Sequence, residues 1–274
     1  MSLERRVPAH LAHLVARAPR SAPAPAPPAR EVVLDRDAIP SPNDEQALAR
    51  FVGATPSRIG KGRAGTRYRT TTYLELREDH AIAKDAVYAQ LPSGLAEELD
   101  CIEIVSACED REQYLLHPNL GRRLSEASRA RLASEATTGA DVQLILADGL
   151  AAPALVLNGK PLLGALASAL RAHGISFGKP LLAHMARVGL QDDVGVLLGS
   201  RATLICLGER PGLGTGDSLS LYLAIGPKLD QDNAEKNCIS NVRPQGMSPG
   251  RAAELAVELL SKGLALGRGG LALA

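Results

Sequence analysis

A glycine-rich loop after a short apolar run is the segment of this chain best suited to binding a ligand. Residues 202–207 read Ala-Thr-Leu-Ile-Cys-Leu, and the loop after them carries the charged pair Glu209 and Arg210 among Gly208, Pro211, Gly212, Gly214 and Gly216. Such an apolar run is typical of a strand that is buried on both faces. Ligands bind at the carboxyl ends of such strands in open parallel sheets, and glycines let a backbone approach them closely. The pattern predicts a binding loop, although an ordinary tight turn with a surface ion pair would also fit.

A second polar segment lies near the C-terminus. Residues 237–244 read Asn-Cys-Ile-Ser-Asn-Val-Arg-Pro and lie outside the regular pattern of predicted strands and helices. Cys238 stands between asparagines and could line a polar pocket or act as a nucleophile. No histidine or other base lies nearby in the sequence, and a small buried thiol is commoner than a reactive one. The pocket-lining interpretation is therefore the better one.

Several chemistries find no support in the spacing of residues. Glycines 212, 214 and 216 lack the dinucleotide fingerprint, and neither a phosphate P-loop nor a Gly-x-Ser-x-Gly elbow is present. No two carboxylates share an evident pocket. The cysteines at 101, 108, 206 and 238 have no zinc-finger spacing, so we predict no metal site and reduced thiols. The chain resembles the binding half of a larger assembly more than a self-sufficient enzyme.

The composition of the chain limits which binding partners and which cellular location can be expected. A length of 274 residues suggests one or two domains. A formal net charge of +1 argues against nucleic acid or a membrane surface as a partner, and the absence of Trp argues against base stacking. No apolar stretch reaches the length of a membrane span, and no secretory signal precedes the cysteines. The expected location is the cytoplasm.

The elements that would position the binding loop follow an α/β pattern. From residue 140 onward, predicted strands at 141–147, 180–185, 202–207 and 219–225 alternate with helices at 161–172, 191–198 and 249–266. Strands alternating with helices imply right-handed crossovers and a largely parallel sheet. We therefore expect an α/β domain over residues 137–274.

The N-terminal half has a different character. Residues 31–136 are expected to be mainly helical, with helices near 44–52, 70–88 and 125–136 and a strand within 99–106. Basic residues from Arg58 to Arg69 alternate with glycines and are either a solvated face or a phosphate-holding loop. Residues 1–30 are rich in proline and are expected to be a flexible tail, whose apolar tip (Leu11, Leu14 and Val15) is either disordered or docks to another protein.

Four segments give the chain a resemblance to a known family. They are Gly-Arg-Ala-Gly-Thr-Arg at 62–67, Pro-Asn-Leu-Gly-Arg-Arg-Leu at 118–124, Asp-Gly-Leu at 148–150, and Gly-Glu-Arg-Pro-Gly-Leu-Gly at 208–214 with Cys-Ile-Ser-Asn at 238–241. In their order and spacing, from about residue 44 to the C-terminus, the chain resembles the small (light) subunit of ethanolamine ammonia-lyase, an adenosylcobalamin enzyme. The N-terminal 40 residues match poorly.

The resemblance implies a fold and a role. It implies a Rossmann-like C-terminal domain that closes one side of the cobalamin site, while the large subunit, a TIM barrel, supplies the other side and binds ethanolamine. The residues that match cobalamin contacts are Val188 for apolar contact, Glu209 as acceptor for ring amides, and Cys238 as a small polarizable group. Ala186 departs from the glycine that relatives usually have there. No catalytic residue is expected in this chain, because the cofactor carries the radical chemistry.

The resemblance also implies how the subunits assemble and where the enzyme is located in the cell. It implies a hetero-oligomer of several large–small pairs, and in some relatives a comparable N-terminal extension directs the enzyme to a bacterial microcompartment. Two other functions fit the sequence. One is an independent nucleotide-binding α/β protein, and the other is a non-catalytic scaffold that uses the proline-rich tail as its interaction element.

Overall fold

The computed structural model describes residues 38–55 and 57–273, in two units that divide between Leu74 and Glu75. The tail predicted at residues 1–30 lies outside the described residues. In the smaller unit, helix α1 (Glu45–Gly53) begins where the Asp44 carboxylate accepts a hydrogen bond from the Ala47 amide at 2.8 Å. The strands β1 (Arg63–Ala64) and β2 (Arg67–Tyr68) form a short hairpin that carries part of the basic stretch.

The larger unit is built on a six-stranded sheet with the order β3-β5-β4-β6-β7-β8. Four neighbouring strands, β3, β5, β4 and β6, run parallel, and β7 and β8 add antiparallel pairs at one side. The strands are β3 (Ile102–Val105), β4 (Val142–Ala147), β5 (Leu181–His184), β6 (Ala202–Gly208), β7 (Leu219–Ile225) and β8 (Lys236–Val242). The expected α/β class and mostly parallel sheet are confirmed.

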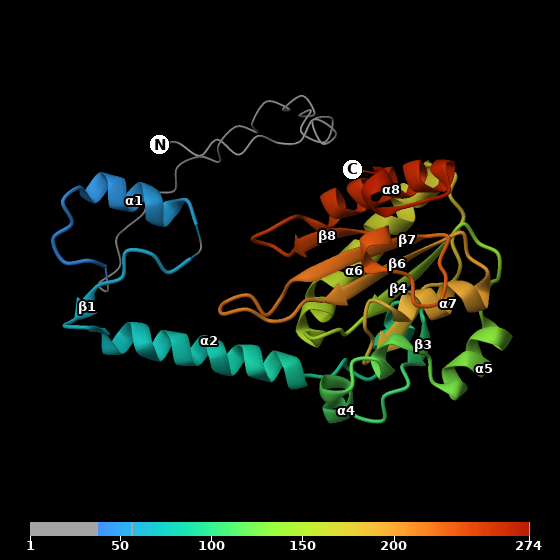
Figure 1. The fold of residues 1–274 in the computed structure, drawn as a ribbon, viewed down its shortest axis with the longest axis horizontal. Helices are drawn as coiled ribbons and strands as arrows, with labels where there is room; N and C mark the ends of the chain where they lie inside the picture. Colours follow the sequence, from blue (N-terminus) through green and yellow to red (C-terminus); the bar gives the residue numbers. More distant parts are fainter. Residues whose placement is uncertain (1–37, 56, 274) are drawn as a thin grey trace, which may run out of the picture. The chain divides into compact units, whose positions relative to one another are not determined.

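Helices cover both faces of this sheet (Figure 1). Apolar side chains of α6 and α8 pack in one core cluster, and those of α5 and α7 pack in a second cluster on the opposite face. The helices and short helical turns are α2 (Thr70–Tyr88), α3 (Leu95–Glu98), α4 (Arg111–Leu116), η2 (Leu120–Arg122), α5 (Glu126–Glu135), α6 (Ala152–Ala172), α7 (Leu190–Leu198), η3 (Asn233–Glu235), α8 (Pro249–Leu266) and η4 (Gly270–Leu273).

The central strands are apolar at nearly every position because helices cover both faces of the sheet. In β4, Leu144 and Leu146 belong to the core under α6, whereas Ile145 and Ala147 belong to the core under α7. All residues of β4 and β6 are buried. Because successive side chains of a strand point to opposite faces, a strand covered on both faces needs apolar residues at every position.

Strand β8 corrects the prediction that residues 237–244 lie outside the regular pattern. It pairs antiparallel with β7, and Cys238 lies opposite Tyr222. The strand is hard to predict from the sequence because it lies at the edge of the sheet. Its residues Cys238, Ser240 and Asn241 are exposed, and only Ile239 and Val242 belong to the hydrophobic core. An edge strand with a polar outer surface lacks the apolar run that marks β4 and β6.

Helix α6 begins nine residues earlier than its predicted start at Pro161, which lies inside the helix. Buried residues on both sides of the proline, such as Leu155 and Leu162, keep the segment helical. The full helix is long and apolar enough to span a membrane by length and composition, contrary to the expectation from sequence. This is weak support for a span, since α6 packs on β4, β6 and α8 and core helices pass the same test.

The remaining predicted elements are close to those observed. The helices predicted at 44–52, 70–88 and 125–136 correspond to α1, α2 and α5, and the strand predicted within 99–106 corresponds to β3. Strand β3 pairs with β5, so the sheet begins well before residue 137.

Candidate functional site

A pocket of about 140 Å³ lies where β4, β5 and β6 end. Strand β4 leads into α6 and β5 into α7, and these helices cover opposite faces of the sheet, so the chain diverges at the ends of adjacent strands. Open α/β sheets bind ligands at such a switch point. The lining residues are Tyr114, Gly149, Leu150, Ala186, Arg187, Val188, Leu207, Gly208, Glu209, Arg210, Ser220 and Tyr222.

The floor of the pocket depends on a close approach of two glycines. A Cβ atom on Gly149 would lie 2.3 Å from the carbonyl oxygen of Gly208, and one on Gly208 would lie 2.3 Å from the carbonyl oxygen of Ala151. Gly149 has a φ of +53°, and the Leu150 amide donates to the Gly208 carbonyl at 3.0 Å. The loops after β4 and β6 are thus in backbone contact, which requires glycine at both positions.

The second half of the glycine loop forms a turn instead of lining the pocket. Gly212 and Thr215 exchange backbone hydrogen bonds at 3.1 and 3.4 Å, and Gly214 has a φ of +77°. The tight turn that the sequence allowed is therefore present in the second half of the loop, whereas ligand binding by the first half stays a prediction. Residues 208–210 line the pocket, and residues 212–215 make the tight turn.

Glu209 is held by the two antiparallel strands beside the pocket. Its Oε1 accepts hydrogen bonds from Ser220 Oγ of β7 at 2.6 Å and from the Asn241 amide of β8 at 2.9 Å. Its own amide donates to the Ser218 carbonyl at 2.9 Å. Within the described residues no hydrogen bond engages Oε2, so this oxygen can accept one from a ligand.

Cys238 does not line the pocket itself. It lies beside Tyr222, on the neighbouring strand, and its exposed thiol interacts with the side chains of Tyr222 and Ser220, which both line the pocket. Burial of the sulfur raises the pKa of Cys238, and the contacts with Tyr222 and Ser220 only partly oppose this shift. The thiol is therefore protonated at neutral pH, which argues against a nucleophilic role.

Val188 reaches the pocket from the turn after β5. It lines the pocket and also packs against the core cluster under α7. The structure therefore brings Val188 and Glu209 into one lining and leaves Cys238 outside it, beside Tyr222 on the neighbouring strand. The side chains lie far apart in the sequence and meet because β5, β6 and β8 belong to one sheet.

A buried ion pair lies next to the turn after β5, which carries Ala186 and Val188. Asp148, at the end of β4, accepts from Arg111 Nη1 at 3.0 Å, and the two side chains are 5% and 10% exposed. Burial raises the pKa of the Asp148 carboxyl, whereas hydrogen bonds from the Met185 and Ala186 amides and the charge of Arg111 act against the rise. The carboxylate serves as an anchor for the turn and not as a group open to a ligand.

Comparison with known proteins identifies the family. Residues 45–274 match the family model described as ethanolamine ammonia-lyase light chain (EutC). The chain belongs to this family. Three relatives are named ethanolamine ammonia-lyase small subunit. The protein from Fusobacterium nucleatum is 38% identical over 85% of this chain and 78% of its own length. The protein from Azotobacter vinelandii is 41% identical over 80% of this chain and 85% of its own length. The protein from Listeria monocytogenes is 32% identical over 81% of this chain and 76% of its own length.

Membership in the light chain family confirms the resemblance and makes the chain a subunit of a lyase. The sequence analysis missed three residues that line the pocket, Tyr114, Ser220 and Tyr222. No local signal marks them, because each is an ordinary residue of a helix or strand until the fold places it beside the glycine loop. Among the described residues no group of three or more His, Cys, Asp or Glu side chains gathers as a metal site.

Proposed function

We propose that this small subunit of ethanolamine ammonia-lyase forms one wall of an adenosylcobalamin site that it shares with a large subunit. The observation that carries the proposal is the pocket beyond β4, β5 and β6, whose lining includes both Val188 and Glu209. When bound, adenosylcobalamin supplies the radical chemistry that converts ethanolamine to acetaldehyde and ammonia. The residues of this chain bind and orient the cofactor and exclude water from it.

The size of the pocket supports a shared site. Pockets that enclose a whole cofactor or drug-sized ligand have volumes of about 300–1,000 Å³. The pocket of about 140 Å³ in this chain is smaller than that range, and a corrinoid is larger than most ligands in it. The chain therefore offers a surface against part of the ring, and the remaining contacts come from another polypeptide.

The chemistry of the lining fits a corrinoid. A corrin ring carries peripheral amide groups, which donate hydrogen bonds, around a broad face that packs on apolar surface. Glu209 Oε2 is placed to accept from such an amide while Oε1 stays bound to Ser220 and Asn241. Val188, Leu150 and Leu207 give the apolar part of the wall.

Cys238 takes a supporting role in this proposal. Its thiol contacts Ser220, which donates to Glu209, and Tyr222, which lines the pocket. A small polarizable side chain at this position packs beside both. Cys238 touches the cofactor only at the exposed side of its sulfur.

The nucleotide-binding alternative fits the topology poorly. In dinucleotide-binding folds the glycine-rich loop leads from a strand into a helix, whose N-terminal amides hold the phosphates. Here the loop after β6 leads into the antiparallel strand β7. The loop therefore offers no helix N-terminus to a phosphate.

The assembly and its place in the cell are further parts of the proposal. The names of the relatives contain "small subunit", which implies a larger partner chain. We propose a hetero-oligomer of several large–small pairs in the cytoplasm, in or outside a bacterial microcompartment. The resemblance of the sequence supports these points.

Copurification with the large subunit tests the cofactor site. The two chains are coexpressed, loaded with adenosylcobalamin and desalted, and the retained corrinoid is measured by its visible absorbance. We expect near-stoichiometric retention by the unsubstituted pair. Glu209→Gln keeps the shape but replaces the charged acceptor, and we expect it to weaken cofactor binding about tenfold, the usual effect of losing a charge-assisted hydrogen bond.

Glu254→Gln is the matched control, because Glu254 is an exposed residue of α8 that pairs with Arg251 at the surface. It should retain the corrinoid as well as the unsubstituted chain does. Assembly of the two subunits without any retained corrinoid contradicts the proposal. Equal retention by both glutamine variants excludes Glu209 as a cofactor contact.

A further inference from the structure

The turn after β5 has a backbone conformation that its sequence does not favour. Met185 has a φ of +53°, in the left-handed region that residues with a side chain rarely adopt. Such a conformation persists only where the surrounding structure fixes it, and it often marks a functional site. The residues that follow Met185 directly, Ala186, Arg187 and Val188, all line the pocket.

Tyr114 of α4 contacts this turn through its hydroxyl, its backbone and its ring. Its Oη donates to the Ala186 carbonyl at 2.9 Å, and its own carbonyl accepts from Arg187 Nη2 at 3.0 Å. The guanidinium carbon of Arg187 lies 4.2 Å from the centroid of the ring. The tyrosine is fully buried, so these contacts are made away from solvent and are strong.

A second guanidinium connects the same ring to Asp148. Arg111 lies 4.6 Å from the centroid of Tyr114 and donates to Asp148 Oδ2 at 3.0 Å. Asp148 Oδ1 in turn accepts from the Ala186 amide at 3.3 Å. Ala186 is therefore held on both sides, by Asp148 at its N–H and by Tyr114 at its carbonyl.

The packing around the turn leaves it little freedom. The Arg187 amide donates to the Gly121 carbonyl at 2.8 Å. A Cβ atom on Gly121 would lie 2.8 Å from Arg187 Cγ and 3.1 Å from Tyr114 Cδ2. Three segments, the end of β4, helix α4 and the turn η2, thus converge on residues 185–187.

We infer that Tyr114 is a positioning residue, which holds the turn 185–188, with Met185 in its left-handed conformation, and so presents Val188 to the ligand. The inference rests on the proposed function for the nature of that ligand. The order of the turn is a property of the chain and can be measured without ligand, so the two proposals are separable.

Tyr114→Phe tests this role, because it keeps the ring and both guanidinium contacts and removes only the hydroxyl. Hydrogen exchange of the Ala186 and Arg187 amides is measured in the complex with the large subunit, and adenosylcobalamin affinity is measured by absorbance titration. We expect exchange at these amides to accelerate about tenfold. Affinity should fall by a similar factor, since a buried carbonyl loses its donor.

A double-mutant cycle separates positioning from a general loss of stability. Val188→Ala should weaken cofactor binding in the parent chain and should have a smaller effect when Tyr114→Phe has already displaced the turn. Val257→Ala on α8, a fully buried residue of the other core cluster, is the stability control. It should lower the melting temperature without changing exchange at residues 186 and 187.

Each outcome decides the inference. Unchanged exchange at the turn, or additive effects of the two substitutions on affinity, would overturn it, as would faster exchange without weaker binding. If the unsubstituted pair retains no corrinoid, the proposed function fails and the exchange measurement alone decides whether Tyr114 holds the turn. If Tyr114→Phe does not accumulate, Arg187→Met, which removes the guanidinium contacts with the Tyr114 carbonyl and ring, tests the same connection by exchange at the Ala186 amide, and unchanged exchange there would overturn the inference.

Discussion

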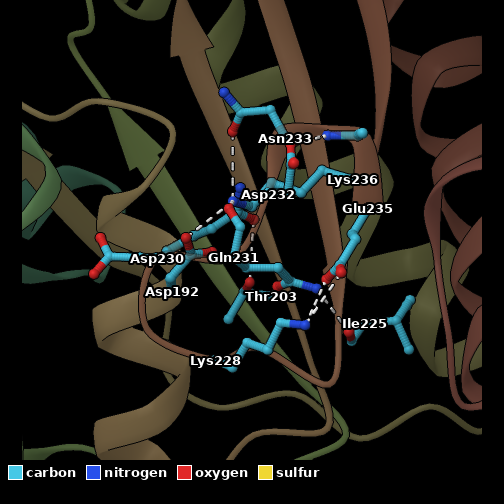
Figure 2. A network of polar contacts seen from close by, with 12 residues as sticks. Asp192, Thr203, Ile225, Lys228, Asp230, Gln231, Asp232, Asn233, Glu235 and Lys236 are labelled. Atoms are coloured by element: carbon cyan, nitrogen blue, oxygen red, sulfur yellow. Dashed lines mark hydrogen bonds and ion pairs between the residues drawn. The ribbon is translucent and has the colours of Figure 1, made fainter.

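Asp192 of α7 and Lys236 at the start of β8 form an ion pair inside the protein. The distance from Nζ to Oδ2 is 2.9 Å, and the two side chains are only 2% and 1% exposed. Figure 2 shows Lys236 beside the loop that joins β7 to β8, and its Nζ also donates to the carbonyl of Gln231 in that loop at 2.7 Å. Burial raises the pKa of Asp192, and the hydrogen bond with Lys236 acts against this. The pair connects the antiparallel edge of the sheet to the helix that follows Val188.

Breaking this pair should be costly. Lys236→Met leaves the Asp192 carboxylate buried without its cation, and such changes destabilise proteins by about 3–5 kcal/mol. Urea unfolding measures the change in free energy. Lys228→Met is the control, because its pair with Glu235 at 2.9 Å is exposed to solvent and should contribute far less to the free energy of unfolding. Equal losses in the two variants would contradict the prediction.

The contact of the loops after β4 and β6 should not tolerate a side chain. Gly208→Ala places a Cβ 2.3–2.4 Å from the carbonyl oxygens of Ala151 and Asp148. Since backbone must shift to relieve this, we expect a loss of at least about 1–3 kcal/mol in unfolding free energy and weaker corrinoid retention. Gly164→Ala on α6 meets nothing within 4 Å and should instead stabilise by about 0.5–1 kcal/mol. An unchanged free energy of unfolding in Gly208→Ala would show that the loops after β4 and β6 separate easily, and would contradict the prediction.

Asp141 should make stability depend on pH. Hydrogen bonds from the Ser176 hydroxyl and amide and from Arg201 lower its pKa from the ordinary 3.8. A carboxyl whose pKa is lower in the folded state stabilises the fold above its unfolded pKa, and this contribution disappears as the pH falls through the folded value. Asp141→Asn should therefore lower the free energy of unfolding at pH 7, by no more than about 1 kcal/mol because solvent screens the site, and by less near pH 3, as measured by urea unfolding. Glu254→Gln should have little effect at either pH, and a constant penalty for Asp141→Asn would refute the assignment.

The thiols should differ in their reactivity with an aromatic disulfide reagent. Burial raises the pKa of Cys206 to about 12, and the residue lies in the core, whereas Cys238 is exposed. In the native full-length chain we expect Cys238 to react slowly, because its pKa is also raised, but well before Cys206, because its sulfur is accessible. Mass spectrometry of labelled peptides gives the order. Bound large subunit and corrinoid should protect Cys238, and labelling of Cys206 at an equal rate would contradict the structure.

The sequence alone determined the elements with strong local signals. Strands β4 and β6 were predicted within one residue, since a strand buried on both faces is apolar throughout. Helix α8 begins at Pro249, after the cap Ser248, and ends before Gly267, signals that act within a single turn of helix. The end of the apolar strand β6 also predicted a pocket at Glu209, which lines one, and its role in binding a ligand stays a prediction. The family was also identified correctly from short segments of residues.

Only the tertiary structure decided what depends on contacts between distant segments. Strand β8 has no apolar run of its own and exists because β7 offers a partner, and α6 continues through Pro161 because the core on both sides of it is filled. Tyr114 and Ala186 are 72 positions apart, and nothing in the sequence near either residue predicts their hydrogen bond. Local patterns report the burial and turns of one segment, whereas a binding wall is made by several segments whose loops meet only when the sheet is complete.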